Sequence, residues 1–459
     1  MITEPMTSLD QLREAAIEVL RMNDLGTMTS AAPNLYPHMW SWDAAFVAIG
    51  LARFDVPRAI TELRTLLAAQ WSTGMIPHIV FSDDDTGYFP GFDRWGTEAA
   101  SARPPQVRTS GICQPPVHAI ALRHILDRAR ENGGEDRDAA ESFVRESFDG
   151  WLAWHRWLAE VRDPDGVGLV EIHHGWESGF DNSPRWDGPY SRIEPGEVAP
   201  FTRRDTLHVA DASERPDDAE YTKYLWLVQQ MAAVNFDDRA VQDTIDFRVR
   251  DVFFSGIMAA SSEVLAGLGD EIGRDEDAAE LRRLARRFRD GVAATIDPET
   301  GLARDYDVLA GTWIATDTVA GFAPLVAGGE EFVLTRQRDI LRSEDWIGHP
   351  ALRFPLPPST SPTSAAFRPR TYWRGPVWPF LVLLLGWASD RDSEAALFAD
   401  LRSASLRQLS DLNFGEYYEP FTGDALGSLN QAWTAAAALE WIGDGAWVAH
   451  DDRDAVTAR

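Results

Sequence analysis

The chain has 459 residues, of which 44% are apolar and 25% are charged, a composition typical of a globular protein. Its 43 basic and 72 acidic residues give a formal charge of −29, which argues against nucleic acid and anionic membranes as partners, because like charges repel. The single cysteine, Cys113, excludes an intramolecular disulfide and is expected to be a buried apolar residue. The N-terminal sequence shows no signal-peptide pattern, so we expect a cytoplasmic protein.

From residue 8 onward, apolar residues recur mostly at spacings of three and four, the pattern of amphipathic helices. In chain order, the predicted helices span residues 8–22, 57–71, 113–131, 138–161, 221–235, 245–268, 275–295, 312–324, 374–389, 393–411 and 430–442. Strands are predicted only at 75–81 and 168–173. We therefore expect an all-α protein, with enough helices for a ring of six inner and six outer helices.

Five long segments separate the predicted helices and carry the unusual residues of the chain. They span residues 24–43, 74–112, 174–220, 343–379 and 412–433. Many of the 18 Trp residues lie in them, beside Pro, Gly and Asp. Loops of this length inside a compact domain are usually functional, so we expect an aromatic-lined cleft between them.

Motifs of several other enzyme classes are missing from the sequence. No glycine-rich phosphate loop, no nucleophile-elbow serine and no His-Glu-x-x-His zinc motif occurs. The run from Asp83 to Asp85 lacks the ligand alternation of a calcium loop and is expected to be a solvated turn. We therefore expect neither a metal nor a cofactor.

The remaining chemical signal is a set of carboxylates among aromatic residues. Sugar rings have apolar faces that stack on Trp and Tyr, and hydroxyl rims that bind polar side chains. Glycoside cleavage needs one protonated carboxyl to protonate the leaving oxygen and a second carboxylate to activate water or attack the anomeric carbon. Taken singly, each candidate has a surface or capping role as its alternative. The candidates are Asp43, Glu177, Asp181, Asp187, Glu416 and Glu419.

Four blocks of aromatic and acidic residues follow one another along the chain. They are Trp40 to Asp43, His174 to Trp186, Tyr372 to Trp378, and Glu416 to Gly423. This order resembles the clan of inverting glycosidases that holds processing α-glucosidase I and trehalase, and within it the bacterial glucosylglycerate and mannosylglycerate hydrolases. The resemblance covers about residues 10–443 and implies one (α/α)6-barrel domain over residues 1–459. Loops at about 74–112 and 187–220 are expected to cover its active site.

The resemblance also implies roles for three carboxylates. Asp181, in Gly-Phe-Asp-Asn-Ser-Pro, matches the general acid, and Asp43 matches a residue that binds sugar hydroxyls. Glu416, the first residue of Glu-Tyr-Tyr-Glu-Pro, matches the general base better than Glu419, because the clan keeps Glu at the first position and an acid or amide before the proline. Inversion would require a gap of roughly 6.5–9.5 Å between the two carboxyl groups, to hold a water.

A hexosyl-glycerate is the small-molecule substrate that the resemblance implies. Arginine suits bidentate capture of a carboxylate, so Arg215 is expected to hold the glycerate; a surface ion pair with Asp211 or Glu214 is its alternative. Residues expected to bind glycerate with it are Tyr88, Tyr221, Tyr372 and Gln431. Residues expected at the sugar are Tyr36, Trp40, Trp42, Gln114, Trp176, Gly179, Trp373, Trp378, Glu419 and Trp433, with core packing as the alternative for the tryptophans.

The sequence leaves other functions open. A trehalase or α-glucosidase of the same clan would not need Arg215. A sugar epimerase on an α/α barrel would rely on paired histidines, for which His78, His118 and His174 are the conceivable members. A catalytically inactive sugar-binding protein is the third alternative. The sequence separates neither glucosyl from mannosyl specificity nor a monomer from a homo-oligomer.

Overall fold

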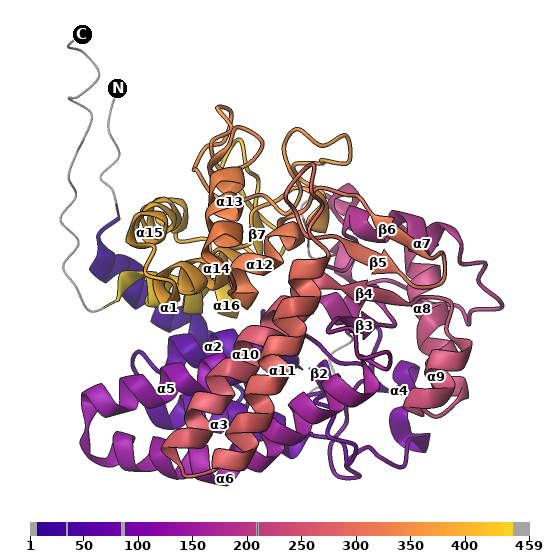
Figure 1. Ribbon diagram of the computed structural model, residues 1–459, viewed down its shortest axis with the longest axis horizontal. Coiled ribbons are helices and arrows are strands. Elements are labelled where there is room, and N and C mark those ends of the chain that lie inside the picture. Colours follow the sequence, from indigo (N-terminus) through magenta and orange to yellow (C-terminus); the bar gives the residue numbers. More distant parts are fainter. Residues whose placement is uncertain (1–6, 34, 84–87, 208, 210, 444–459) are drawn as a thin grey trace.

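The computed structural model describes residues 7–33, 35–83, 88–207, 209 and 211–443. Its centre is a closed ring of inner helices, in which each helix packs against the next and the last packs against the first (Figure 1). The ring consists of α2 (Ser41–Leu51), α5 (His118–Asn132), α10 (Val252–Glu271), α12 (Ala323–Ala327), α14 (Pro379–Arg391) and α16 (Ala432–Ile442).

An outer helix packs against each inner helix. The outer helices are α1 (Leu9–Met22), α3 (Val56–Ala68), α6 (Gly134–Val161), α11 (Asp275–Ala294), α13 (Glu331–Arg342) and α15 (Ala395–Leu409). Inner and outer helices alternate along the chain. This arrangement confirms the predicted (α/α)6 barrel.

The two rings differ in how their helices are buried. Every residue of α2 is buried, whereas α11 buries one stripe that includes Leu281, Ala285 and Phe288 and exposes charged residues on its other side. A helix surrounded by other helices has no polar face, and a helix on the outside has one. The apolar periodicity of the sequence therefore reports the outer ring better than the inner one.

Helix α10 is long and apolar enough to cross a membrane by length and composition, the one such helix among the described residues. Of its most apolar 18-residue window, 83% is buried inside the molecule. It packs against α5, α11 and α12, so it is a core helix of the barrel.

Several predicted elements differ from the structure. Helix α2 was not predicted, and its first three residues were assigned to the segment 24–43, because a helix that is apolar on all sides has no periodicity. Helix α13 was not predicted. The predicted helix 312–324 begins instead as strand β6 (Thr312–Ile314) and continues through a 3₁₀ turn into α12. The predicted helix 245–268 starts later, because β4 (Val249–Asp251) precedes α10 and the Asp251 side chain caps it.

Short antiparallel strands and small helices connect the barrel helices. Strand β1 (Met39–Trp40) pairs with β2 (Ile79–Val80), and β7 (Tyr417–Tyr418) pairs with β8 (Ala425–Leu426). A four-stranded sheet has the order β3 (Val170–Ile172), β4, β5 (Asp305–Asp307), β6. Helices α4 (Phe92–Trp95), α7 (Asp187–Ser191), α8 (Asp218–Ala233) and α9 (Asp238–Thr244) complete the fold. Strands β1 and β4 lead directly into α2 and α10, so the sheets fix the N-terminal ends of inner helices.

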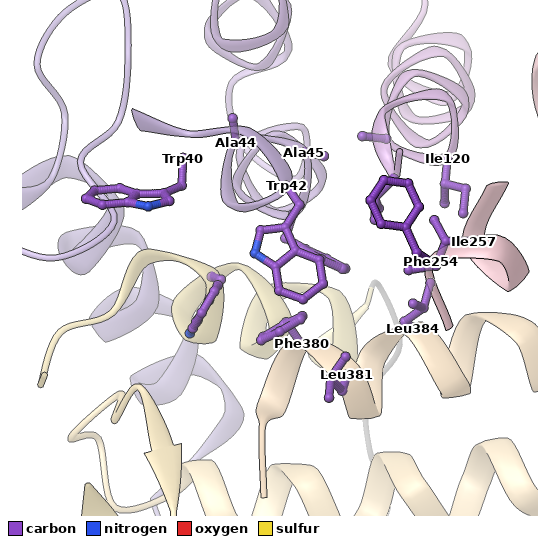
Figure 2. Close-up of a cluster of buried hydrophobic side chains, with 14 of the residues drawn as sticks. Trp40, Trp42, Ala44, Ala45, Ile120, Phe254, Ile257, Phe380, Leu381 and Leu384 are labelled. Atoms are coloured by element: carbon purple, nitrogen blue, oxygen red, sulfur yellow. The ribbon is translucent and has the colours of Figure 1, made fainter. Parts of the chain in front are cut away.

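Trp42, near the start of α2, joins the barrel core to these helix ends. Figure 2 shows its ring beside Phe380 of α14, with Phe254 and Ile257 of α10 further along the same cluster. The Trp42 and Phe380 ring centroids are 4.8 Å apart. Trp40, on β1, lies apart from this cluster in the same view. The N-terminal end of α2 is therefore anchored by a large buried aromatic residue.

Candidate active site

A cavity open to solvent lies at the N-terminal ends of inner helices, and the empty space in it, together with the solvent at its mouth, is about 1080 Å³. Its wall combines residues at the starts of α2 and α16 with residues of the long loops that precede α5 and α14. Both loops that were expected to cover the site reach the cavity, through Tyr88, Phe89, Arg204, Asp205, Arg215 and Pro216.

Most of the predicted site residues meet in this one cavity. Those that line it are Tyr36, Trp40, Trp42, Asp43, Tyr88, Gln114, Trp176, Gly179, Asp181, Arg215, Tyr221, Tyr372, Trp373, Glu416, Gln431 and Trp433. They come from segments separated by hundreds of residues in sequence. Their common location is the property required of a substrate site, and their individual roles remain predictions.

Two predicted site residues, Trp378 and Glu419, are not part of the cavity lining. The Trp378 ring stacks on the Trp373 ring at 3.6 Å and so supports it from behind. Glu419 Oε2 accepts hydrogen bonds from the backbone N–H groups of Phe421 and Thr422, which directs its carboxylate into its own turn. Both side chains are buried by these local contacts, so neither has a contact with the cavity.

Sequence reasoning missed several residues of the cavity wall. They are Ala31, Leu35, Pro37, His78, Phe89, Arg204, Asp205, Pro216 and Tyr224. Tyr224 could have been found, because it lies three residues after Tyr221 on α8 and therefore on the same helix face. Arg204 and Asp205 lie at the start of a single 3₁₀ turn, Asp205–Leu207, which is too short for periodicity to indicate which side chains face inward.

Asp181 lies on a turn held tightly against the barrel. Gly179 has φ +75°, and a Cβ atom there would lie 2.2 Å from the Trp42 ring, so only glycine lets the turn approach so closely. Asn182 Oδ1 accepts a hydrogen bond from the Trp373 N–H at 3.0 Å, which ties this turn to the wall opposite. The position of Asp181 is thus set on both sides by its chain neighbours.

Burial raises the pKa of Asp181 to about 8. The Arg215 guanidinium opposes this shift, and the Glu416 carboxylate adds to it. The Tyr372 hydroxyl lies 3.4 Å from Asp181 Oδ2. Below about pH 8 this side chain is a protonated carboxyl, the form that a general acid requires.

Glu416 is held as a hydrogen-bond acceptor by three donors. Its Oε1 accepts from the Tyr36 hydroxyl at 2.9 Å, and its Oε2 accepts from Arg215 Nη2 at 2.7 Å and from the Ser428 N–H at 3.1 Å. Its side chain is 1% exposed. These contacts fix the direction of the carboxylate at the cavity wall.

A chain of tyrosine hydroxyls joins the two carboxyl groups. The Tyr372 hydroxyl lies 3.4 Å from Asp181 and 3.3 Å from the Tyr36 hydroxyl, which in turn lies 2.9 Å from Glu416. The carboxyl oxygens can be no further apart than this path is long. This upper limit is compatible with the gap of inverting enzymes.

Arg215 is buried beside the base candidate. It binds Glu416 through Nη2 and donates from Nη1 to the Tyr36 hydroxyl at 2.9 Å, and its Cζ lies 4.3 Å from the Tyr372 ring centroid. The alternative surface pair is absent, because Glu214 pairs with Arg370 and Asp211 accepts from Ser213. Arg215 thus brings a buried positive charge to the cavity.

Asp43 is the third carboxyl of the cavity. Burial raises its pKa well above its ordinary value, and the carboxylates of Glu416 and Asp181 act in the same direction. The carboxyl oxygens of Asp43 can accept hydrogen bonds from sugar hydroxyls, which suits contact with the substrate.

The other carboxylate candidates have structural partners. Glu177 binds the buried Arg162 through both oxygens, at 2.7 and 2.8 Å, and Asp187 pairs with Arg374. Of the three histidines considered for an epimerase, only His78 lines the cavity. Burial lowers the pKa of His78 to about 3, so it is neutral and has no histidine partner within the described cavity wall.

Comparison with known proteins agrees with this geometry. Residues 36–434 match the family described as mannosylglycerate hydrolase MGH1-like glycoside hydrolase domain. The glucosylglycerate hydrolase of Mycolicibacterium hassiacum is 52% identical over 445 residues, which cover 96% of this chain and 99% of that protein. The mannosylglycerate hydrolase of Thermus thermophilus is 40% identical, with 93% of this chain and 99% of that protein covered.

Solved structures give the same result for the fold. A crystal structure of mannosylglycerate hydrolase from Thermus thermophilus, in complex with Tris and D-glycerate, superposes with a TM-score of 0.85 at 39% identity and covers 94% of this chain and 99% of its own. Neutral trehalase of Saccharomyces cerevisiae has a TM-score of 0.53 at 15% identity, with 91% and 74% covered. The trehalase likeness concerns the barrel fold alone.

Proposed function

Because the chain belongs to the family of mannosylglycerate hydrolase MGH1-like glycoside hydrolases, we propose that it hydrolyses the α-glycosidic bond of glucosylglycerate, with inversion at the anomeric carbon. Mannosylglycerate is the second proposed substrate. The observation that carries the proposal is the pairing, in one aromatic cavity, of a carboxyl with a raised pKa, Asp181, and a separate carboxylate, Glu416.

In the proposed reaction Asp181 gives its proton to the glycosidic oxygen as the bond to the anomeric carbon breaks. Glu416 takes a proton from a water on the opposite face of the sugar, and the water oxygen bonds to the anomeric carbon. The products are hexose and glycerate, and solvent later exchanges the two protons. The path through the two tyrosine hydroxyls is compatible with a spacing that leaves room for this water.

Two arginine side chains in the cavity support an anionic leaving group. The chain carries a formal charge of −29, yet Arg204 and Arg215 both line the cavity. An acidic protein that binds glycerate needs such a local positive charge, whereas trehalose is uncharged and needs none. Tyr88, Tyr221 and Gln431 offer hydroxyl and amide groups for the glycerate hydroxyls.

The relatives support glucose as the preferred sugar. The glucosylglycerate hydrolase is 52% identical to this chain and the mannosylglycerate hydrolase of Thermus thermophilus is 40% identical. The two sugars differ only in the orientation of one hydroxyl, which a single contact can distinguish.

A substrate panel tests the proposal. Purified enzyme is incubated with glucosylglycerate, mannosylglycerate and trehalose, and NMR follows the anomer of the released hexose. We expect release of β-glucose from glucosylglycerate, slower release of β-mannose from mannosylglycerate, and no release of hexose from trehalose. Release of the α-anomer would exclude inversion, and preferential cleavage of trehalose would exclude a glycerate subsite.

A matched pair of variants tests which glutamate is the base. We expect Glu416→Gln to lower kcat by about 10²–10⁴-fold, the usual contribution of a general base. The control is Glu419→Gln, which keeps the oxygen that accepts from Phe421 and Thr422 and should retain most activity. The reverse result would assign the base to Glu419.

A further inference from the structure

Arg215 makes a contact that a simple substrate clamp would not make. Its Nη2 lies 2.7 Å from Glu416 Oε2, and the two side chains are 2% and 1% exposed. Arg215, which is expected to bind the leaving group, is therefore already paired with Glu416, which is expected to activate water. Together with the Ser428 N–H, Arg215 occupies Glu416 Oε2, so this oxygen has less room to accept a proton from water.

Part of the Arg215 guanidinium has no partner. Nη1 binds the Tyr36 hydroxyl and Nη2 binds Glu416, but the buried Nε–H has no hydrogen-bond partner among the described residues. An unpaired buried donor costs free energy, and a bound carboxylate would remove this cost. Because Arg215 lines the cavity, a ligand anion bound there lies beside its guanidinium.

A second buried ion pair of the chain provides a contrast. Arg162 binds Glu177 through both of its oxygens, and neither residue lines the cavity. The pair of Arg162 and Glu177 is therefore assigned a structural role. Arg215 and Glu416, by comparison, both line the cavity, so a ligand there lies beside this pair.

We propose that Arg215 couples recognition of the leaving group to activation of the base. The carboxylate of the bound substrate pairs with the guanidinium of Arg215. This contact weakens the ion pair between Arg215 and Glu416. Glu416 is then free to accept a proton from water. This inference rests on the proposed function, and it makes Arg215 a residue that discriminates against neutral glycosides in kcat and not only in KM.

The coupling has a consequence for substrates without a carboxylate. With a neutral glycoside, Arg215 stays on Glu416, so the water is activated slowly even when the sugar site is full. A plain carboxylate clamp would instead weaken binding alone and leave kcat unchanged at saturation. The two cases therefore differ in a measurable quantity.

Glycosyl fluorides separate the two halves of the substrate. α-Glucosyl fluoride fills the sugar site with a neutral substrate and leaves the leaving-group site free for an added anion. In its hydrolysis Glu416 takes a proton from water, the water oxygen bonds to the anomeric carbon, and the C–F bond breaks with its electron pair on fluoride. Fluoride leaves without help from an acid, so the rate reports the base step.

The experiment measures fluoride release from α-glucosyl fluoride, and from α-mannosyl fluoride in parallel, as D-glycerate is added. We expect a saturable rise in kcat of roughly tenfold, a fraction of what a general base contributes. Glycerol at the same concentrations should have no effect, because it lacks the carboxylate. In Arg215→Met the rise should disappear, and in Arg64→Met, a change at an exposed arginine of α3, it should persist.

A rate that D-glycerate leaves unchanged or only inhibits in the unaltered enzyme would overturn the coupling, and so would stimulation that persists in Arg215→Met. The unaltered enzyme gives the first result without any question of misfolding. Failure of the proposed function has a different signature, namely no cleavage of either hexosyl-glycerate. Cleavage of glucosylglycerate without stimulation by glycerate would leave the function intact and remove the coupling alone.

Discussion

Gly427 lies directly against the carboxylate of Glu416: a Cβ atom at position 427 would be 2.4 Å from Glu416 Oε2. The φ of Gly427 is +71°, a backbone conformation that favours glycine. The next residue, Ser428, donates its N–H to the same oxygen. The loop between β8 and α16 therefore holds the base candidate by direct backbone contact.

We expect Gly427→Ala to displace this carboxylate and to lower kcat by about 10²-fold, the usual cost of an ångström-scale misplacement of a catalytic group. The control is Gly423→Ala. Gly423 has φ +80°, but a Cβ atom there would meet the Phe354 ring at 3.0 Å and not the base. Both variants carry the strain of the left-handed backbone, roughly 1 kcal/mol. Equal losses of kcat in the two variants would show that strain, and not contact with Glu416, determines the effect.

The pKa of Asp181 predicts the alkaline limb of the pH profile. Because burial raises this pKa to about 8, kcat/KM for glucosylglycerate should fall about tenfold per pH unit above that value, as the acid loses its proton. Kinetics between pH 5 and 10 measure the limb. With α-glucosyl fluoride, which needs no acid, the limb assigned to Asp181 should be absent. Asp181→Asn should abolish cleavage of glucosylglycerate and still hydrolyse the fluoride; loss of both activities would assign a different role to Asp181.

Apolar periodicity predicted most helices of both rings and missed α2 of the inner ring and α13 of the outer ring, while the barrel itself was implied by the family resemblance. Amphipathic helices such as α11 expose one face to water, and this face leaves a periodic pattern in the sequence. Helix α2 has no such face, so the residues at its start were assigned to a loop, although Trp42 and Asp43 were recognised as site residues from their motif. In this segment the apolar periodicity missed the helix, whereas the motif identified the site residues.

Contacts between distant segments were beyond the sequence. Arg215 and Glu416 are 201 positions apart, and nothing near either residue indicates that they pair. The motif match placed both residues at the site and gave them separate partners, water for one and glycerate for the other. A motif also does not show which of its residues line the cavity. Trp378 lies in a site motif, but its ring stacks behind that of Trp373.

The buried pair of Glu177 and Arg162 predicts a large effect on stability. Burial alone would raise the pKa of Glu177, but the attraction of Arg162 and hydrogen bonds from that residue and the His173 N–H outweigh it and hold the pKa at about 2. Replacement by Gln leaves a buried arginine without its counter-charge, which typically costs about 3–5 kcal/mol. Urea unfolding of Glu177→Gln at pH 7 should show this loss of free energy of unfolding.

The control for this change is Glu146→Gln, which breaks an exposed pair with Arg64 and should leave the free energy of unfolding unchanged. Since the folded-state pKa of Glu177 is depressed, its contribution is present above the unfolded value near 4.5 and is lost as the pH falls towards 2. The difference between the unaltered enzyme and Glu177→Gln should therefore shrink below about pH 4. A difference that is constant down to pH 2.5 would contradict the ion pair as its source.

Asp181 predicts a dependence of stability on pH with the opposite sign. Its folded-state pKa of about 8 lies above the usual value near 4, so between these values the unfolded chain ionises this group while the folded protein keeps it protonated. Stability is therefore lost as the pH rises, by about 1.4 kcal/mol per pH unit, until the loss levels off near pH 8.

Asp181→Asn removes the ionisation from both states. The stability of this variant relative to the unaltered enzyme, measured by urea unfolding, should increase from pH 5 to 8 and stay constant above. A relative stability that does not change with pH would mean that Asp181 titrates normally, and the assignment of Asp181 as a general acid with a raised pKa would be lost with it.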